Sequence, residues 1–249
     1  MDSYNSQLGS RQYEDFTNSE SGQFQQKILL DYILASLDRN PKQKILDAGC
    51  GSGWLTHALA GLFADVCGCD ASAELIAYAK NKYPKQEFLV CDLTANLPFE
   101  KNSVDAIVAN MSLHDMDNVP QALENFKLIT KPGGKLVITI SNPYYSLPVG
   151  VWKRGILGRL LLKKPKLLLR PYFYFKNKTD RKFGWGDNIT SHFYSLAEYI
   201  NWAVDNGFAL TQMREIQAKT DSPNFNLQYQ LYRFPYILLL EFKKSNFIK

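Results

Sequence analysis

The chain has 249 residues, of which 45% are hydrophobic and 21% charged, and its 29 lysines and arginines against 24 acids give a net charge of +5. This length can bury a sizeable core, so we expect one domain with an insertion rather than two independent domains. No apolar stretch approaches the roughly 18 residues that a membrane span needs, and residues 1–21 are too polar for a secretory signal. Together these features predict a cytoplasmic protein.

The first predicted element is an amphipathic helix over residues 22–39. Apolar side chains recur there at helical spacing, namely Phe24, Ile28, Leu29, Tyr32, Ile33 and Leu37. Such a stripe is typical of a helix that packs on a sheet. The residues before it are mostly polar but include Tyr13 and Phe16, so they form either an ordered arm or a frayed terminus.

A glycine-rich turn over residues 45–54 is the most informative motif. It joins an apolar strand, which ends near Asp47, to a predicted helix over residues 54–64 through Gly49, Gly51 and Gly53. Glycine permits a sharp turn and lets a ligand approach the backbone N–H groups at a helix start. Trp54 occupies the last glycine position of a dinucleotide-binding G-x-G-x-x-G motif, and no Gly-Lys-Ser/Thr sequence follows. The turn therefore indicates a nucleotide-type ligand of another kind.

The elements that follow place polar residues at the ends of strands. A short strand over residues 65–69 leads to Asp70, where a carboxylate can accept hydrogen bonds from both hydroxyls of a ribose. A helix over 72–83 and a strand over 87–91 lead to Asp92 and Leu93. A fourth strand over 104–109 ends at Asn110. A helix over Val119–Ile129, capped by Asp117 or Asn118, and a fifth strand over 136–141 complete the series. This alternation predicts a doubly wound parallel sheet with helices on both faces.

The glycine turn and the polar residues at the strand ends, taken in this order, resemble those of the class I S-adenosylmethionine-dependent methyltransferases. The resemblance covers residues 24–142 and 195–243. The resemblance implies an α/β fold with a seven-stranded sheet in the order 3-2-1-4-5-7-6 and an antiparallel last strand. It also implies S-adenosylmethionine as cofactor and S-adenosylhomocysteine as product. Asp70 would contact the ribose, Asp92 the adenine, and Asn110 the methionine part. The implied cofactor residues are Asp47, Gly49, Cys50, Gly51, Gly53, Asp70, Ala71, Asp92, Leu93, Asn110 and Ser112.

The resemblance divides the chain into three parts. Residues 1–142 contain the N-terminal arm and the Rossmann-like cofactor core, and related enzymes fold such an arm over the cofactor cleft. Residues 143–190 are an insertion after the fifth strand. Residues 191–249 complete the core with a capped helix over 195–204 and a hairpin of two strands, Phe208–Ile216 and 232–243.

The insertion is strongly basic. Residues 151–182 contain 11 lysines or arginines and one acid, Asp180, so the rest of the chain is acidic overall. Leucines alternate with these cations, and Pro165 divides the segment into two predicted helical pieces. Three interpretations remain open: a cap that attracts an anionic or amphiphilic acceptor, a nucleic-acid groove, or a solvated basic face over core leucines.

The cysteines and acids do not form a recognisable metal site. Cys50, Cys67, Cys69 and Cys91 lack C-x-x-C spacing, so we expect reduced, structural thiols. The sequence Asp115-x-Asp117 lacks the glycine and the distal glutamate of a calcium loop. We therefore expect no metal.

Candidate catalytic residues are those that reach the carboxyl edge of the sheet. Methyl transfer from a sulfonium is an in-line displacement, so positioning supplies most of the catalysis, and a base is needed only where the acceptor must lose a proton. His114 follows the fourth strand, His192 lies where the chain leaves the insertion, and Tyr13 lies in the arm. These three are the candidates.

The sequence favours an enzyme that transfers a methyl group to a small-molecule or lipid-like acceptor. Two alternatives remain: an RNA- or DNA-modifying methyltransferase that uses residues 151–182, and a cofactor-binding regulatory or scaffold protein without turnover. A nucleic-acid complex would weaken steeply as salt rises, which separates the first alternative from a small-molecule enzyme. The intact glycine turn and its acids argue against the second. Peripheral contact with a membrane surface is left open.

Overall fold

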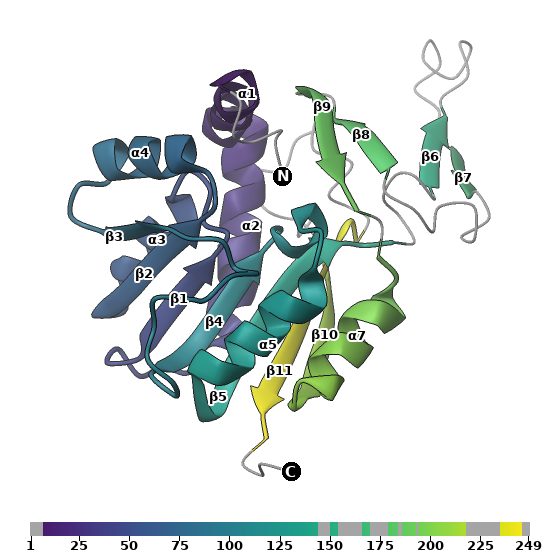
Figure 1. Cartoon of the computed structure of the whole chain (residues 1–249). Coiled ribbons are helices and arrows are strands. Elements are labelled where there is room, and N and C mark those ends of the chain that lie inside the picture. Colours follow the sequence, from purple (N-terminus) through teal and green to yellow (C-terminus); the bar gives the residue numbers. More distant parts are fainter. Residues whose placement is uncertain are drawn as a thin grey trace.

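The computed structural model describes residues 7–143, 150–153, 166–169, 179–183, 186–192, 194–217 and 235–245. The helices are α1 (Gln7–Asn18), α2 (Glu20–Ser36), α3 (Trp54–Ala60), α4 (Ala73–Lys82), the short 3-10 helix η1 (Leu113–Asp115), α5 (Val119–Ile129) and α7 (Leu196–Asp205). The strands are β1 (Lys44–Ala48), β2 (Asp65–Asp70), β3 (Glu87–Val90), β4 (Val104–Asn110), β5 (Thr130–Ser141), β6 (Gly150–Lys153), β7 (Lys166–Leu169), β8 (Thr179–Phe183), β9 (Gly186–Ser191), β10 (Phe208–Ile216) and β11 (Ile237–Lys244). Figure 1 shows their arrangement.

A seven-stranded sheet forms the centre of the fold. Its strand order is β10-β11-β5-β4-β1-β2-β3. The strands from β5 to β3 are parallel, whereas β11 is antiparallel to both β5 and β10. Counted along the core, this is the order 3-2-1-4-5-7-6 with an antiparallel last strand, so the predicted topology is confirmed. The carboxyl ends of the parallel strands therefore lie along one edge, where ligands bind in folds of this type.

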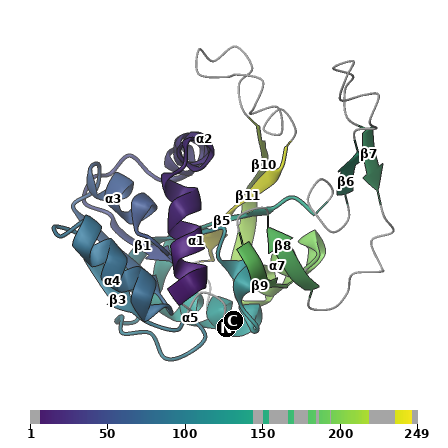
Figure 2. The same ribbon diagram turned by 90° about the horizontal axis from the view of Figure 1, so that it is seen from above.

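Helices cover both faces of the sheet. On one face α5 and α7 pack on a core that includes Leu123, Phe126 and Phe242, and on the other α2 and α3 pack around Ile33, Leu55 and Leu59 (Figure 2). The strands of the sheet centre read as continuous apolar runs because both of their faces are buried. None of the helices in the described ranges is long and apolar enough to cross a membrane.

Side-chain caps fix where several helices begin. The Ser72 hydroxyl accepts a hydrogen bond from the Leu75 backbone at the start of α4. Ser195 and Glu198 form a capping box at the start of α7. Asn118 caps α5, as one of the two predicted possibilities. These caps satisfy backbone N–H groups that a helix cannot pair internally. Only a few residue types can do this, so the starts of these helices could be predicted from the sequence. The α3 helix is shorter than predicted: it ends at Ala60 instead of residue 64.

The N-terminal arm is an ordered helix. Residues predicted to be a polar arm form α1, which lies beside α4 in Figures 1 and 2. At one end the Ser10 hydroxyl donates to the Glu74 carboxylate at 3.1 Å, and at the other Lys82 donates to the Asn18 side chain at 2.6 Å. The helix α1 also approaches β9. These contacts support the ordered arm over the frayed terminus.

Within the described residues the insertion is extended. The strands β6 and β7 pair antiparallel, as do β8 and β9. Residues 166–169 form β7, so the helical piece predicted to follow Pro165 is wrong for these residues, because their backbone groups pair with β6 instead of within a helix. Most of the basic segment over residues 151–182, including Lys163 and Lys164, lies outside the described residues.

Candidate cofactor and acceptor site

The glycine turn follows β1 and leads into α3. Gly49 has φ +77° and Gly51 has φ +52°, both in the left-handed region that favours glycine. A Cβ atom on Gly49 would overlap the Ser112 side chain, and one on Gly51 would lie 2.9 Å from the Tyr13 ring. The Cys69 carbonyl accepts hydrogen bonds from the backbone N–H groups of Gly49 at 2.8 Å and Cys50 at 2.9 Å. The glycines of the turn therefore expose backbone without side chains. The turn is fixed to the end of β2, and the Tyr13 ring packs on it at Gly51.

Asp70 ends β2 beside this turn. One carboxylate oxygen accepts from the Gly51 N–H at 2.9 Å, and the other accepts from the Ser72 N–H at 2.9 Å. Burial raises the pKa of Asp70, while these two backbone donors oppose the rise. A carboxylate has about four lone-pair positions, so acceptor capacity remains for a ligand hydroxyl. This geometry suits the ribose contact implied by the family resemblance.

Asp47 lies on the interior side of the turn. Its side chain is 1% exposed and accepts a hydrogen bond from the Thr56 hydroxyl of α3 at 2.7 Å. Burial raises the pKa of Asp47 to about 7, against the hydrogen bonds from Thr56, which lower it. The carboxyl group thus holds α3 against the turn. Thr56, which the sequence argument missed, is its partner.

The buried carboxyl of Asp47 predicts a pH dependence of stability. Its pKa is near 3.9 in an unfolded chain and about 7 in the folded one, so the folded state binds more protons between these values. The stability contributed by this group is complete below about pH 4 and is lost as pH rises to 7. Replacing Asp47 with asparagine removes this loss. The unfolding free energy of Asp47→Asn minus that of the wild type should therefore rise by at most about 1.4 kcal/mol per pH unit between about pH 4 and 7, then level off.

Urea unfolding at several pH values between 4 and 8 measures this difference. Asp65→Asn is the matched control, because Asp65 lies at the other end of β2 with a side chain 48% exposed. Its difference from the wild type should stay nearly flat. Parallel pH curves for Asp47→Asn and the wild type would contradict the burial of an uncharged carboxyl.

Two further predicted cofactor residues follow β3. One Asp92 carboxylate oxygen accepts from both the backbone N–H and the hydroxyl of Thr94, at 2.8 and 2.7 Å. Leu93 is 4% exposed, so its side chain belongs to the core, and its carbonyl accepts from the Asn125 side chain at 2.9 Å. Asp92 thus has a fixed orientation near the end of β2, because β2 and β3 are parallel neighbours.

The segment after β4 is held by its neighbours. The Asn110 side-chain oxygen accepts from the Thr139 hydroxyl at 2.7 Å, and the Ser112 hydroxyl donates to the Ala48 carbonyl at 2.8 Å. Met111 has φ +55°, a conformation that costs a non-glycine residue roughly 1–2 kcal/mol. Thr139 also accepts from the Met111 N–H at 3.0 Å. Thr139 was missed because only strand register places it opposite Asn110.

The structure brings two of the candidate catalytic residues together. His114 lies in η1, is 6% exposed, and its Nε2 is 3.7 Å from an Asp115 carboxylate oxygen. The His192 backbone N–H donates to the His114 carbonyl at 2.7 Å, and His192 Nε2 lies 2.9 Å from the Asp117 carboxylate. The chain that leaves the insertion is therefore attached directly to the loop after β4.

Tyr194 strengthens this attachment. Its hydroxyl donates to the Met116 carbonyl at 2.9 Å, and its ring stacks against His192 with centroids 5.4 Å apart. The same ring packs edge-on against Tyr199 and Trp202 of α7. The third histidine, His57, is exposed on α3 and stacks on Tyr83.

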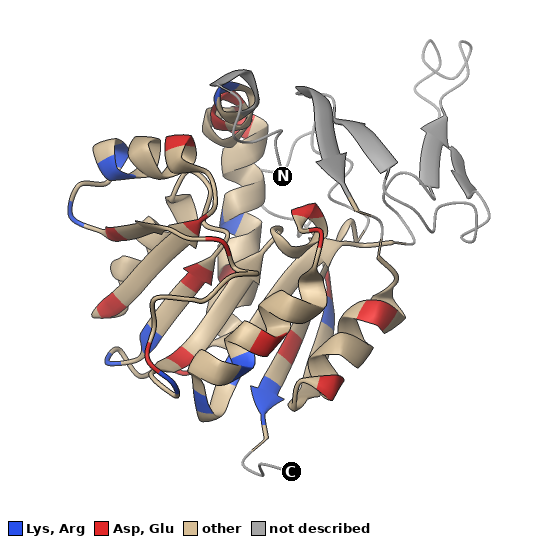
Figure 3. Cartoon of the chain, in the orientation of Figure 1, with Lys and Arg blue, Asp and Glu red and all other residues tan. Residues whose placement is uncertain are grey.

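Tyr13, the third catalytic candidate, faces the acidic edge of the sheet. Burial raises the pKa of the Tyr13 hydroxyl, and the negative charges of Asp70 and Asp47 raise it further. The hydroxyl is therefore neutral at physiological pH and suited to donate a hydrogen bond. In Figure 3 acidic residues colour several of the loops along this edge. Such an edge favours a ligand that carries positive charge.

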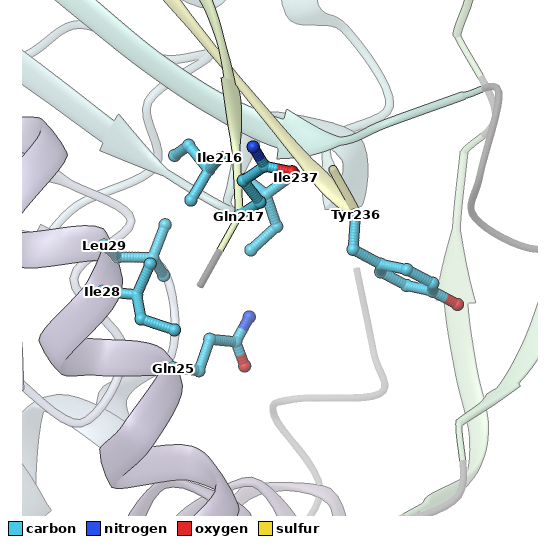
Figure 4. A pocket seen from close by; sticks show the side chains of 7 residues that line it. All are labelled: Gln25, Ile28, Leu29, Ile216, Gln217, Tyr236 and Ile237. Atoms are coloured by element: carbon cyan, nitrogen blue, oxygen red, sulfur yellow. The ribbon is translucent and has the colours of Figure 1, made fainter. Parts of the chain in front are cut away.

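A small apolar pocket lies farther along the same edge. It is lined by Gln25, Ile28, Leu29, Ile216, Gln217, Tyr236 and Ile237, from α2 and the facing ends of β10 and β11 (Figure 4). Its cavity volume is about 10 Å³, which is room for roughly one water molecule. It is therefore too small to hold an acceptor molecule.

The fold and the turn together define a class of protein. The strand order, the three-glycine turn after β1 and the acid at the end of β2 are those of a class I S-adenosylmethionine-dependent methyltransferase. Residues 46–138 match the family model for a methyltransferase domain. Over these residues, from β1 to β5, the chain is similar to that family.

Known proteins agree with this assignment. The chain is 35% identical over 143 residues to demethylmenaquinone methyltransferase of Paenarthrobacter aurescens, covering 57% of this chain and 56% of that protein. It is 35% identical over 115 residues to the biotin biosynthesis bifunctional protein BioHC of Cellvibrio japonicus, covering 46% of this chain and 22% of that protein. The chain thus spans about half the length, or less, of these curated relatives. A crystal structure of an S-adenosylmethionine-dependent methyltransferase from Mesorhizobium loti has the same fold, with a TM-score of 0.71 and 21% identity over 86% of this chain and 96% of that one.

Proposed function

We propose that this protein transfers the methyl group of S-adenosylmethionine to a small-molecule acceptor and releases S-adenosylhomocysteine. The observation that carries the proposal is the fixed Asp70 carboxylate beside the bare glycine turn, with hydrogen bonds from Gly51 and Ser72. It provides acceptors for a ribose and backbone for close ligand approach at one place. The bound cofactor would supply an already activated methyl group.

The residues of this chain then have distinct proposed roles. Asp70 and Asp92 hold the ribose and the adenine, and Asp47 keeps the turn in shape through Thr56. The loop after β4, from Asn110 to His114, would orient the methyl donor against the acceptor. Since displacement at a methyl group depends mainly on alignment, a rigid loop of this kind is the main requirement.

Tyr13 and the two histidines are the proposed contacts of the acceptor. Tyr13 covers Gly51 and would shield the cofactor from water. His114 is the proposed contact or base for the acceptor, because it lies in η1 at the carboxyl edge of the sheet and an imidazole can accept or donate a proton. His192 would act with it, held by its contact with Asp117 and by the backbone hydrogen bond to His114.

A small organic acceptor is the proposed substrate class. The Paenarthrobacter relative is named for demethylmenaquinone, which supports a small, lipid-like acceptor. The proposed basic cap for an anionic or amphiphilic acceptor falls mostly on residues outside the described ranges. The proposed substrate class therefore rests on the relatives and not on the cap.

Binding of S-adenosylhomocysteine should raise the thermal unfolding midpoint. At 100 times its dissociation constant the ligand adds about 2.7 kcal/mol, which is a rise of roughly 5–11 °C for a chain of this length. Differential scanning fluorimetry measures the shift, with NAD as the control, because Trp54 removes the dinucleotide spacing. Absence of a shift at millimolar S-adenosylhomocysteine, with the protein folded, would refute the proposed function.

Labelled cofactor identifies the acceptor class. We would add the protein and S-adenosylmethionine with an isotopically labelled methyl group to a cell lysate and identify the labelled products by mass spectrometry. We expect the label in a metabolite of the small-molecule or lipid extract. Label recovered in RNA or DNA, with binding that weakens steeply as salt rises, would instead support a nucleic-acid substrate.

A further inference from the structure

Two cysteines directly precede the two acids assigned to the cofactor. Cys69 is followed by Asp70 at the end of β2, and Cys91 is followed by Asp92 just after β3. These strands are parallel neighbours, with Cys69 opposite Leu89. The Cys91 N–H donates to the Asp70 carbonyl at 2.9 Å, so the two strand ends remain attached up to Cys91.

Both thiols lie on the same face of the sheet. Side chains two residues apart along a strand share a face, so Cys91 lies on the face of Leu89, which is also that of Cys69. Leu89 and Cys91 both pack against the core cluster that contains Cys69. A hydrogen bond from the Cys69 side chain lowers the pKa of Cys91, and the same bond raises the pKa of Cys69.

The two thiols differ in access to solvent. Cys69 is fully buried, whereas Cys91 is partly exposed. Burial raises the pKa of Cys50 and of Cys67, which are also buried and therefore unreactive. An accessible, more acidic thiol beside a second thiol is the arrangement that peroxide-sensing cysteines use.

We propose that Cys91 and Cys69 are an oxidation site, at which hydrogen peroxide forms a disulfide that prevents cofactor binding. The effect on the cofactor rests on the proposed function, but the disulfide itself does not. The Cys91 thiolate attacks the peroxide oxygen and becomes a sulfenic acid, releasing hydroxide. That hydroxide takes the proton that the Cys91 thiol gave up and becomes the first water. The Cys69 sulfur then attacks the Cys91 sulfur and displaces a hydroxide, which takes the Cys69 thiol proton and becomes the second water. Two thiols plus one peroxide thus yield one disulfide and two waters.

Closing this disulfide must move Asp70 and Asp92, the two acids proposed to contact the cofactor. The two sulfurs, which lie on one face of neighbouring strands in the reduced protein, have to approach to about 2.05 Å. The segment just after β3, with Asp92, is therefore drawn toward β2. The Cys69 carbonyl also holds the N–H groups of Gly49 and Cys50, so the glycine turn is strained by the same change. A fixed site loses affinity when its groups are displaced by about 1 Å.

The experiment treats the reduced, full-length protein with hydrogen peroxide and follows two readouts. Peptide mapping without reductant should find a Cys69–Cys91 cross-link, with the loss of two hydrogens. Titration calorimetry with S-adenosylhomocysteine should show binding weakened at least tenfold, and dithiothreitol should restore it.

Two serine variants test the assignment. Cys91→Ser should bind S-adenosylhomocysteine as the untreated wild type does and should lose the response to peroxide. Cys67→Ser is the matched control: it changes another buried thiol of β2 and should keep both the cross-link and the response. Peroxide sensitivity retained in Cys91→Ser would overturn the proposal.

The remaining outcomes are also decisive. Oxidation of Cys91 to sulfinic acid without a cross-link would overturn the disulfide, and a cross-linked protein that binds S-adenosylhomocysteine normally would overturn its effect. If the reduced wild type does not bind S-adenosylhomocysteine at all, the proposed function fails, while the peptide map still decides whether the disulfide forms.

Discussion

Replacing Gly49 with alanine should lower the unfolding free energy by about 2–5 kcal/mol. The φ angle of +77° costs an alanine roughly 1–2 kcal/mol. In addition, the new Cβ would overlap the Ser112 side chain, and forcing such an overlap in a packed site typically costs about 1–3 kcal/mol. Because Ser112 is bonded to the Ala48 carbonyl, it cannot move away freely. Urea unfolding measures the loss.

Gly207→Ala is the matched control for this variant. Gly207 has the same φ angle of +77°, but a Cβ there would meet nothing closer than a Lys127 side-chain carbon at 4.0 Å. It should therefore lose only the backbone cost of about 1–2 kcal/mol and keep normal S-adenosylhomocysteine binding. Equal losses in the two variants would mean that the contact with Ser112 contributes nothing, and the close packing of the turn would be disproved.

Asp70→Asn should weaken S-adenosylhomocysteine binding about 10- to 150-fold. Hydrogen bonds from ligand hydroxyls to a charged group are worth roughly 1.5–3 kcal/mol, and asparagine removes the charge. The amide also has one acceptor oxygen, whereas the carboxylate accepts from Gly51 and Ser72 with two. One of these backbone donors would therefore face an N–H₂ group, and the turn itself would be disturbed.

Titration calorimetry of Asp70→Asn and Asp65→Asn separates a specific effect from a general one. Asp65 begins the same strand, and its contact with Lys44 at 3.7 Å is on the surface. Its replacement should change binding less than twofold. Affinity retained in Asp70→Asn would remove the ribose contact from the proposed site, whatever the thermal shift of the wild type shows.

Local patterns explain why much of the fold was predictable. The glycines after β1, the helix caps at Ser72 and Ser195, and the apolar strands act over a few residues, and each was read correctly. The strand order also followed, because right-handed crossovers and the family resemblance leave few arrangements. The predicted helical piece after Pro165 failed, since leucine-rich residues suit a strand as well as a helix and the pairing with β6 decided between them.

The orientation of side chains in the site could not be read in the same way. Asp47 occupies the acidic position of the motif, yet it turns to Thr56 and is buried. His192 was a catalytic candidate by its place in the chain, and its contact with Asp117 spans 75 residues of sequence. No periodicity relates such pairs, because they depend on how separate loops meet at the sheet edge.

The sequence by itself determined the order of the elements and the resemblance to a known fold, because these depend on short-range backbone preferences and on spacing along the chain. Only the tertiary structure decided that Tyr13 covers Gly51, that a backbone hydrogen bond joins His192 to His114, and that Cys69 and Cys91 pack in the same core cluster. The physical reason is that strand register and helix packing set these distances, and both arise from contacts between residues far apart in the sequence.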